Sequence, residues 1–121
     1  MDPWCVREYR VSEDHLAGHL SARGVKVLST PSLLLFIERS VRECLDSSLG
    51  EGLVSVGYRV DLKHLKPAAL GDSIRVEAFL LDRSGSRLLV YVRVYRGDGS
   101  LIGEAVHERR ITDLDSIKSR L

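Results

Sequence analysis

One short stretch near the first quarter of the chain decides the fold, and it reads Ser29-Thr30-Pro31-Ser32-Leu33-Leu34-Leu35-Phe36-Ile37-Glu38. Thr30 is a residue type that caps helix N-termini, and Pro31 suits the first helical position, where an N–H is not needed. The apolar run that follows has no polar side, which is typical of a buried helix. Gly50 is a natural stop. We therefore predict one central helix over residues 31–49 that carries a single inward carboxylate, Glu38.

Composition limits the class of protein. The chain has 121 residues with 44% hydrophobic and 29% charged residues, and its formal net charge is +1. These values predict one globular domain over residues 1–121, with no excess of positive charge for nucleic acid or a membrane surface. No long apolar span and no signal peptide are evident, so we expect a cytoplasmic protein. Two cysteines do not make a disulfide framework, and we expect Cys44 to be a small core residue on the helix.

Alternating hydrophobic residues predict four consecutive strands after the helix, over residues 53–65, 73–82, 87–96 and 100–112. A weaker strand is expected within residues 4–12, and a short helix within residues 113–121. In the first of the four strands, one face is predicted to consist of Val54, Val56, Tyr58, Val60 and Leu62. His64 is in phase with this face and should point towards the helix. One helix on one face of an antiparallel sheet defines an α+β domain.

This order of elements resembles the hotdog fold, in which a sheet wraps a central helix, and within it the fluoroacetyl-CoA thioesterase group. The matching residues, across about residues 10–112, are Val27-Leu28-Ser29-Thr30-Pro31 leading to Glu38, Val56-Gly57 with Val60 to Leu65, Gly71, and Gly103 with His107 and Arg109. The resemblance implies an acyl-CoA thioesterase with catalytic Thr30, Glu38 and His64. It also implies that Gly57, His107 and Arg109 bind substrate, that neither a metal nor a cofactor other than substrate coenzyme A takes part, and that the chain forms a homodimer.

One departure concerns the acyl group. The fluoroacetyl enzyme is known for phenylalanines that gate its pocket just ahead of the threonine. The same stretch here reads Ala22-Arg23-Gly24-Val25, without an aromatic residue. A more general acyl-CoA thioesterase is therefore the better hypothesis.

The three residues are suited to thioester hydrolysis. Glu38 can act as a base or as a nucleophile, and His64 can relay a proton near neutral pH. Thr30 can donate its hydroxyl, and a helix N-terminus offers N–H groups to a developing oxyanion. Eight residues of helix span about 12 Å, so a capping Thr30 cannot touch Glu38 of the same chain. We therefore expect a site shared between two subunits.

Each of these residues also has a structural explanation. Thr30 alone would be a helix cap, Glu38 a partner for Arg59 or Arg109, and His64 a core histidine. Arg109 has two candidate roles, binding a phosphate of coenzyme A or pairing with Glu38. At the level of function, the alternatives are a non-catalytic acyl-CoA-binding or regulatory module and a hotdog hydratase, for which no Asp–His motif is present.

Two further patterns carry weaker predictions. The spacing of Asp14, His15 and His19 is a weak metal signal without a second ligand cluster, and we expect surface residues there. A simple hairpin register would place Phe79 opposite Leu89, near Leu81 and Tyr91, on the face away from the helix. Such a patch indicates an interface, and back-to-back sheets would then give a tetramer, unless the C-terminal helix covers it through its apolar residues, Leu114, Ile117 and Leu121.

Overall fold

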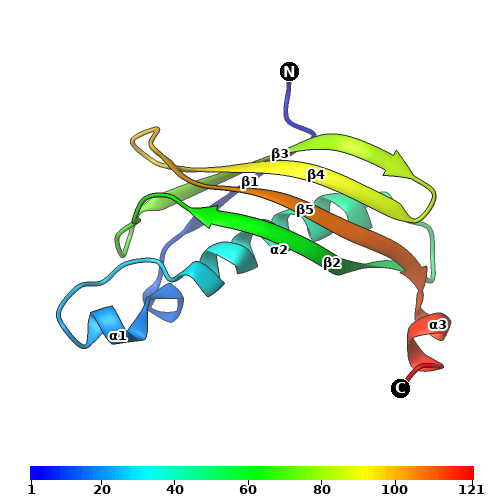
Figure 1. The fold of residues 1–121 in the computed structure, drawn as a ribbon, viewed down its shortest axis with the longest axis horizontal. Coiled ribbons are helices and arrows are strands. Elements are labelled where there is room, and N and C mark those ends of the chain that lie inside the picture. Colours follow the sequence, from blue (N-terminus) through cyan, green and yellow to red (C-terminus); the bar gives the residue numbers. More distant parts are fainter.

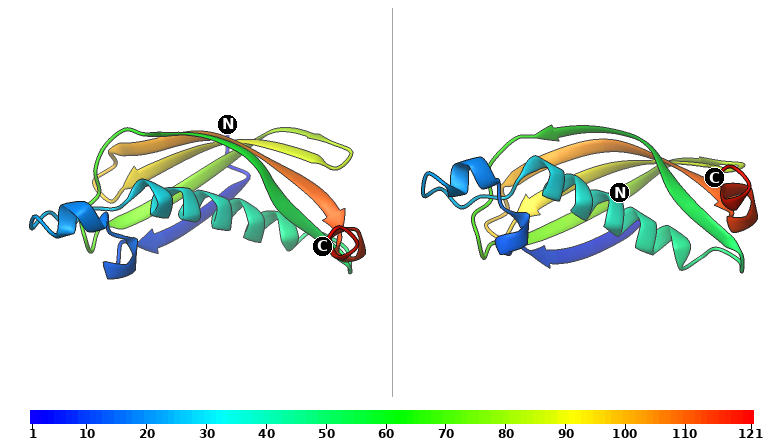
Figure 2. Two further views of the ribbon diagram at one scale, coloured as in Figure 1. Left: turned by 60° about the horizontal axis from the view of Figure 1, so that its bottom comes forward. Right: turned by 90° about the horizontal axis from the view of Figure 1, so that it is seen from below.

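The computed structural model describes residues 1–121 as one antiparallel sheet that curls around a single long helix (Figures 1 and 2). The strands are β1 (Cys5–Arg10), β2 (Leu53–His64), β3 (Ser73–Ser84), β4 (Arg87–Arg96) and β5 (Leu101–Asp113), in the order β1-β3-β4-β5-β2. The central helix is α2 (Thr30–Asp46). Three short helical segments, η1 (Glu13–His15), α1 (Gly18–Ser21) and α3 (Leu114–Lys118), lie outside this core. The predicted α+β class and wrapped architecture are confirmed.

The start of α2 differs from the prediction by one residue. Ser29 is the N-cap, and its hydroxyl accepts a hydrogen bond from the Ser32 amide at 3.1 Å. Thr30 is therefore the first helical residue and not the cap, because the preceding serine performs that task. The hydroxyl of Thr30 is left free for another partner.

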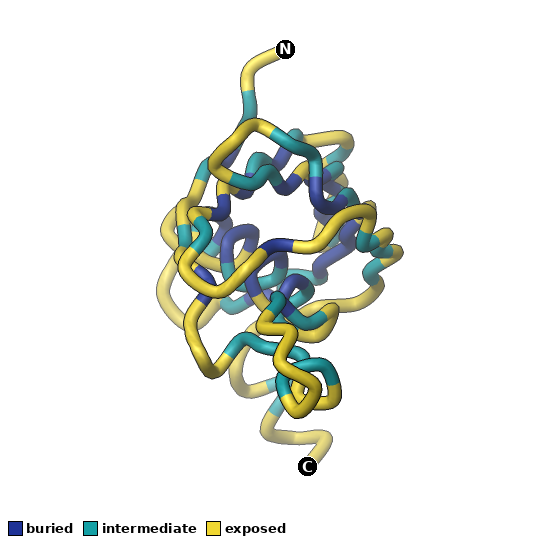
Figure 3. The backbone as a smooth tube through the Cα atoms, turned by 90° about the vertical axis from the view of Figure 1, so that its left-hand side faces the viewer, coloured by how far each residue is buried: buried dark blue, intermediate teal, exposed yellow.

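The central helix is also less enclosed than its sequence indicated. Its buried residues, Leu33, Phe36, Ile37, Ser40, Val41 and Leu45, recur at helical spacing and face the sheet. Leu35 is 42% exposed, so the prediction of a helix buried on all sides was wrong. The helix ends at Asp46 and not at Leu49, since the hydroxyls of Ser47 and Ser48 donate hydrogen bonds to backbone carbonyls of its last turn. Figure 3 shows the buried stretches gathered in the interior and both termini exposed.

A β-bulge in β2 overturns half of the alternation predicted for that strand. The register with β5 shifts between Gly57 and Arg59. A bulge adds one residue and reverses which side chains face inward on either side of it. Ser55 is consequently buried, whereas Val56 and Tyr58 are 41% and 64% exposed. Beyond the bulge, the predicted inward face of Val60, Leu62 and His64 holds.

The hairpin of β3 and β4 shows a second bulge. All four predicted inward residues of β4, Leu88, Val90, Val92 and Val94, are buried. The turn is tighter than predicted, with Ser84 opposite Arg87, and the register shifts by one between Leu80 and Asp82, so Phe79 lies opposite Tyr91 and not opposite Leu89. Leu80, beside this bulge, is 39% exposed and not inward as predicted. The short helix α3 lies at the end of β5, where the Leu114 amide bonds the Gly52 carbonyl, and it does not cover the outer face of the sheet (Figure 2).

Cys5 and Cys44 form a disulfide that joins β1 to α2, with 6.1 Å between their Cα atoms. Cys44 packs against the core as expected, but its bond to Cys5 was not predicted. Two cysteines 39 positions apart in sequence do not disclose their proximity, which depends on β1 packing beside the helix. The bond closes a long loop and ties an edge strand to the core.

Reduction of this disulfide should therefore destabilise the fold without abolishing it. Closing a loop of this length restricts the unfolded chain and contributes roughly 3–4 kcal/mol, which corresponds to a melting temperature lower by roughly 10–15 °C after treatment with dithiothreitol. Differential scanning calorimetry measures the change. A Cys5→Ala/Cys44→Ala variant is the control, because its melting temperature should not respond to the reductant. An unchanged wild-type transition in dithiothreitol would contradict the prediction.

Candidate active site

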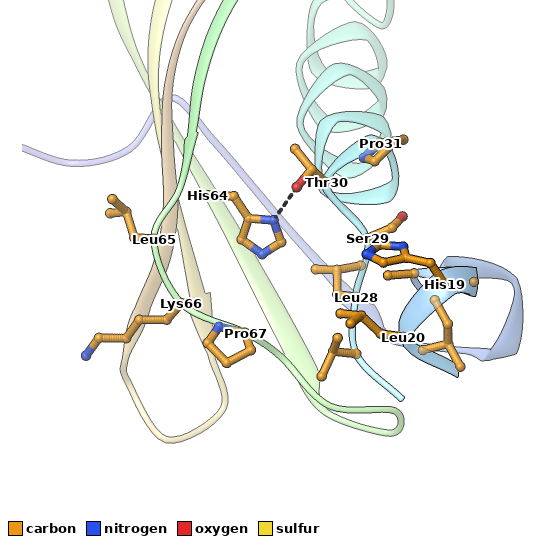
Figure 4. Close-up of a pocket in the computed structure, with 14 residues that line it drawn as sticks. His19, Leu20, Leu28, Ser29, Thr30, Pro31, His64, Leu65, Lys66 and Pro67 are labelled. Carbon is orange, nitrogen blue, oxygen red and sulfur yellow. Dashed lines mark hydrogen bonds between the residues drawn. The ribbon is translucent and has the colours of Figure 1, made fainter. Parts of the chain in front are cut away.

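Thr30 and His64 meet at one end of the molecule. Thr30 is the first residue of α2 and His64 the last residue of β2, and Thr30 Oγ1 lies 2.8 Å from His64 Nδ1 (Figure 4). The other ring nitrogen, Nε2 of His64, is buried and has no hydrogen-bond partner. An imidazole with one nitrogen engaged and the other free is positioned to exchange a proton with a bound molecule.

The pair opens into a cavity of about 720 Å³ between α1 and the end of β2. This end lies opposite α3 in Figure 1. Apolar groups dominate the exposed lining, and none of the fourteen lining residues is Phe, Tyr or Trp: Leu16, Ala17, Gly18, His19, Leu20, Val27, Leu28, Ser29, Thr30, Pro31, His64, Leu65, Lys66 and Pro67. An apolar cavity with a few convergent polar groups is the common form of a small-molecule site.

The helix start leaves one backbone amide without a partner beside this cavity. Pro31 has no N–H, the Ser32 amide bonds Ser29 Oγ, and the Leu33 amide bonds the Ser29 carbonyl. The amide of Thr30 is thus the N–H that the first turn leaves for an oxyanion, beside the hydroxyl of the same residue.

Burial sets the protonation state of His64. Desolvation lowers the pKa of His64 below its ordinary value of 6.5, and the opposing effect of the Lys66 backbone is smaller. The ring is therefore neutral at pH 7. A neutral imidazole can accept a proton, which a base in hydrolysis must do.

Glu38 occupies a second cluster, deeper along the helix. Its Oε2 lies 3.4 Å from Nη1 of Arg109, and a Cβ placed on Gly57 would come within 2.6 Å of that oxygen. Gly57 faces Glu38 because the β2 bulge follows it. The absence of a side chain at this position gives the carboxylate its room.

The two clusters do not meet within one chain. Thr30 and His64 lie together, but Glu38 stands two turns further along α2, about 12 Å away at 1.5 Å per residue. His107 is fully buried and Arg109 is 3% exposed, so within the chain both face the Glu38 cluster and not a ligand. Gly57 lies against the same carboxylate. The side chain of Arg59 does not bond Glu38. The backbone carbonyl of Arg59 instead accepts a hydrogen bond from His107 Nδ1.

Sequence reasoning missed two residues of the Glu38 cluster, Ser55 and Asp46. The hydroxyl of Ser55 lies 2.8 Å from Asp46 Oδ1 and 2.9 Å from Arg109 Nε. The alternation pattern placed Ser55 on the outer face, and the only sequence signal against that was Gly57, a candidate for a bulge. Asp14, His15 and His19 form no group of metal ligands. The rings of His15 and Phe36 pack in a T-shaped pair with their centroids 4.7 Å apart.

The curled sheet around one central helix is the hotdog fold, and the Thr30–His64 pair beside a cavity is its candidate active site. In a comparison with protein families, residues 11–115 match the family described as fluoroacetyl-CoA-specific thioesterase. The chain belongs to this family, and it is an enzyme that hydrolyses acyl-CoA thioesters.

Solved structures agree on the fold. A hot-dog-like protein from Thermanaerovibrio acidaminovorans has 26% identity and a TM-score of 0.85, over 95% of this chain and 84% of that one. The fluoroacetyl-CoA thioesterase FlK has 21% identity and a TM-score of 0.85, over 95% and 89% of the two chains. A hypothetical protein of Thermus thermophilus, described as a thioesterase superfamily member, has 22% identity and a TM-score of 0.85, over 99% and 89%. A search of curated proteins gives no match. No helix of this structure has the length and apolarity to cross a membrane.

Two histidines, the half-buried His64 and the fully buried His107, should make stability depend on pH. Desolvation lowers the pKa of His107 as it does that of His64. The unfolded chain takes up protons near pH 6.5, whereas the folded chain does so only at lower pH. Stability should therefore be constant above pH 7 and fall as the pH drops from 6.5 towards 5. Thermal melts across this range measure the effect. The slope should become shallower in His64→Gln, and an equal slope in that variant would contradict the assignment.

Proposed function

We propose that the protein hydrolyses acyl-CoA at a site built from two protomers, with Thr30 and His64 of one chain facing Glu38 of the other. The observation that carries this proposal is the hydrogen-bonded Thr30–His64 pair at the mouth of an apolar cavity, with the only nearby helix carboxylate out of its reach. A solved complex of FlK with acetyl-CoA supports the class of substrate. Water is the only other reactant, and coenzyme A enters as part of the substrate.

Glu38, Thr30 and His64 each have a separate role in the hydrolysis. Glu38 acts on the thioester carbonyl, as the base for an attacking water or as the nucleophile. The amide and hydroxyl of Thr30 stabilise the oxyanion that forms when the carbon–oxygen double bond opens. In the base route, Glu38 gives the proton taken from water to the neutral imidazole of His64, which passes it to the departing thiolate as the intermediate collapses and the carbon–sulfur bond breaks. In the nucleophile route, collapse leaves an anhydride on Glu38; a water then cleaves this anhydride and restores the carboxylate, and a proton from that water reaches the thiolate through His64. The free acid and coenzyme A are the products.

The edge strand β2 supports the two-protomer arrangement. Over its twelve residues β2 pairs with β5 alone, which leaves its other edge unpaired. Leu53, Val56, Tyr58 and Leu65 are exposed along or beside that edge. Exposed edges of this kind pair with another chain. Antiparallel pairing of two β2 strands, centred between Val60 and Asp61, would place Gly57 opposite His64 of the partner subunit. Glu38 would then stand beside the partner's Thr30–His64 pair.

Further assembly and location stay predictions. The outer patch of Phe79, Leu81, Leu89 and Tyr91 is not covered by α3, and Leu81 is 53% exposed. A tetramer formed by back-to-back sheets would bury it. A cytoplasmic location also stays a prediction, against which the Cys5–Cys44 disulfide counts, since disulfides are rare in reducing compartments.

Glu38→Gln and His64→Ala should each lower thioester turnover by about two orders of magnitude or more, the usual scale for acid–base groups. Release of thiol from a panel of acyl-CoAs measures the rate. Glu43→Gln, an exposed change on the same helix, is the matched control and should retain the wild-type rate. Because Ser29 is the cap, Thr30→Ala should lower the rate with little loss of melting temperature. A wild-type rate in Glu38→Gln would remove the proposed mechanism.

The lack of Phe, Tyr and Trp in the cavity predicts weak selectivity between fluoroacetyl-CoA and acetyl-CoA. The stretch Ala22-Arg23-Gly24-Val25 is exposed and places no ring over Thr30. We expect ratios of kcat/KM within about tenfold, or about 1.4 kcal/mol. Parallel assays with the two substrates decide this. A preference of a thousandfold, about 4 kcal/mol, would show that another element selects the acyl group.

A further inference from the structure

We propose that Ser55 and Asp46 are positioning residues of the hydrolysis, which act through Arg109 on the carboxylate of Glu38. This inference rests on the proposed function, in which Glu38 is the reacting carboxylate. It assigns a role to two side chains that lie outside the cavity and that belong to different elements, α2 and β2.

The first observation is that Glu38 has one charged partner and much freedom. Its side chain is 39% exposed, and its ion pair with Arg109 is the contact that orients its carboxylate. Gly57 opposes it without a side chain. A glutamate has several rotamers, so the direction of this carboxylate depends on where the guanidinium of Arg109 is held.

The second observation is that Arg109 is held on several sides. Its side chain is 4% exposed. Nε donates to Ser55 Oγ at 2.9 Å, Nη2 donates to the Ser55 carbonyl at 3.0 Å, and Nη1 lies 3.4 Å from both Glu38 Oε2 and His107 Nε2. Ser55 thus supplies two of the four contacts, one from its side chain and one from its backbone.

The directions of these hydrogen bonds follow from the donors available. Arginine only donates, so Ser55 Oγ must accept from Arg109 Nε. The single proton of the Ser55 hydroxyl is then directed to Asp46 Oδ1, 2.8 Å away. Asp46 therefore fixes the Ser55 hydroxyl in the orientation that receives Arg109.

His107 contacts the guanidinium of Arg109 through Nη1. Nη1 of Arg109 can only donate, so Nε2 of His107 is the acceptor of their contact. The ring proton of the neutral His107 is therefore on Nδ1, which donates to the Arg59 carbonyl at 3.0 Å. The charged and titratable groups around Arg109 are Glu38, Asp46 and Arg42 from α2 and His107 from β5. Loss of the Ser55 hydroxyl would leave Arg109 between these groups without its main side-chain anchor.

The test compares Ser55→Ala with Ser55→Thr in the chain of 121 residues. For an acyl-CoA that the wild type hydrolyses, Ser55→Ala should lower kcat by about 10- to 100-fold and leave KM within about threefold, because binding in the cavity is untouched. Ser55→Thr keeps a hydroxyl and should restore most of kcat. Asp46→Asn, which retains an oxygen acceptor, is the milder variant if Ser55→Ala melts below the assay temperature, and it should lower kcat by a smaller factor.

Ser40→Ala is the matched control. Ser40 is a fully buried serine of α2 whose hydroxyl bonds the Phe36 carbonyl and lies 3.1 Å from Tyr9, with no link to Glu38. This variant should lose stability but keep kcat. An equal loss of kcat in Ser40→Ala and Ser55→Ala would assign the effect to general destabilisation and overturn the proposal.

A double variant separates this inference from the proposed function. If Ser55 acts through Glu38, Ser55→Ala should lower the residual rate of Glu38→Gln by no more than about twofold. A full additional loss in that background would overturn the positioning role while leaving the site intact. A wild-type rate in Glu38→Gln itself would instead overturn the proposed function, and the positioning role with it. A wild-type kcat in Ser55→Ala beside an impaired Glu38→Gln would overturn the positioning role alone.

Discussion

The packing of α2 against the concave face of the sheet fixes the position of every side chain proposed for the chemistry. The helix buries Leu33, Phe36, Ile37, Val41 and Leu45, each with 0% exposure, so its rotation about its own axis is set by the core. With that rotation fixed, the stripe of Thr30 and Glu38, two turns apart, faces β2. Thr30 then meets His64 at one end of the strand, and Glu38 meets Gly57 beyond the bulge. A rigid helix cannot bring these two positions together, and this separation is the reason for proposing a site shared by two chains.

The sequence was informative wherever regular periodicity governed the structure. The four inward residues of β4 and the inward phase of His64 follow from strict alternation, and the helical period of the central stretch located α2. Irregular features escaped the same reasoning. The bulge after Gly57 turned Ser55 inward and Val56 outward, and Ser29 took the capping position that Thr30 equally fits by residue type. A pattern cannot decide between two adjacent capping residues, because the choice depends on how the preceding loop enters the helix.

The Glu38 cluster was only half visible for a related reason. Arg109 and Glu38 are 71 positions apart, and their meeting depends on the pairing of β5 with β2 beside α2. The sequence left open whether Arg109 binds a phosphate or pairs with Glu38, and its 3% exposure favours the pairing. A buried cation needs several partners to offset its desolvation, and here Ser55, Glu38 and His107 supply them. The cluster therefore combines a structural requirement with control over the direction of one carboxylate. The Cys5–Cys44 bond likewise arises from strand packing that no local pattern encodes.

The shared site is the central claim, and mixed dimers test it most directly. Glu38→Gln and His64→Ala chains, each inactive alone, would be unfolded and refolded together in equal amounts, and thiol release from an acyl-CoA would be measured. Random pairing makes half of the dimers mixed, and each mixed dimer has one site with both residues intact, so activity should return to about a quarter of the wild-type value. A mixture no more active than its two parents would show that Glu38 and His64 do not act across the interface between chains.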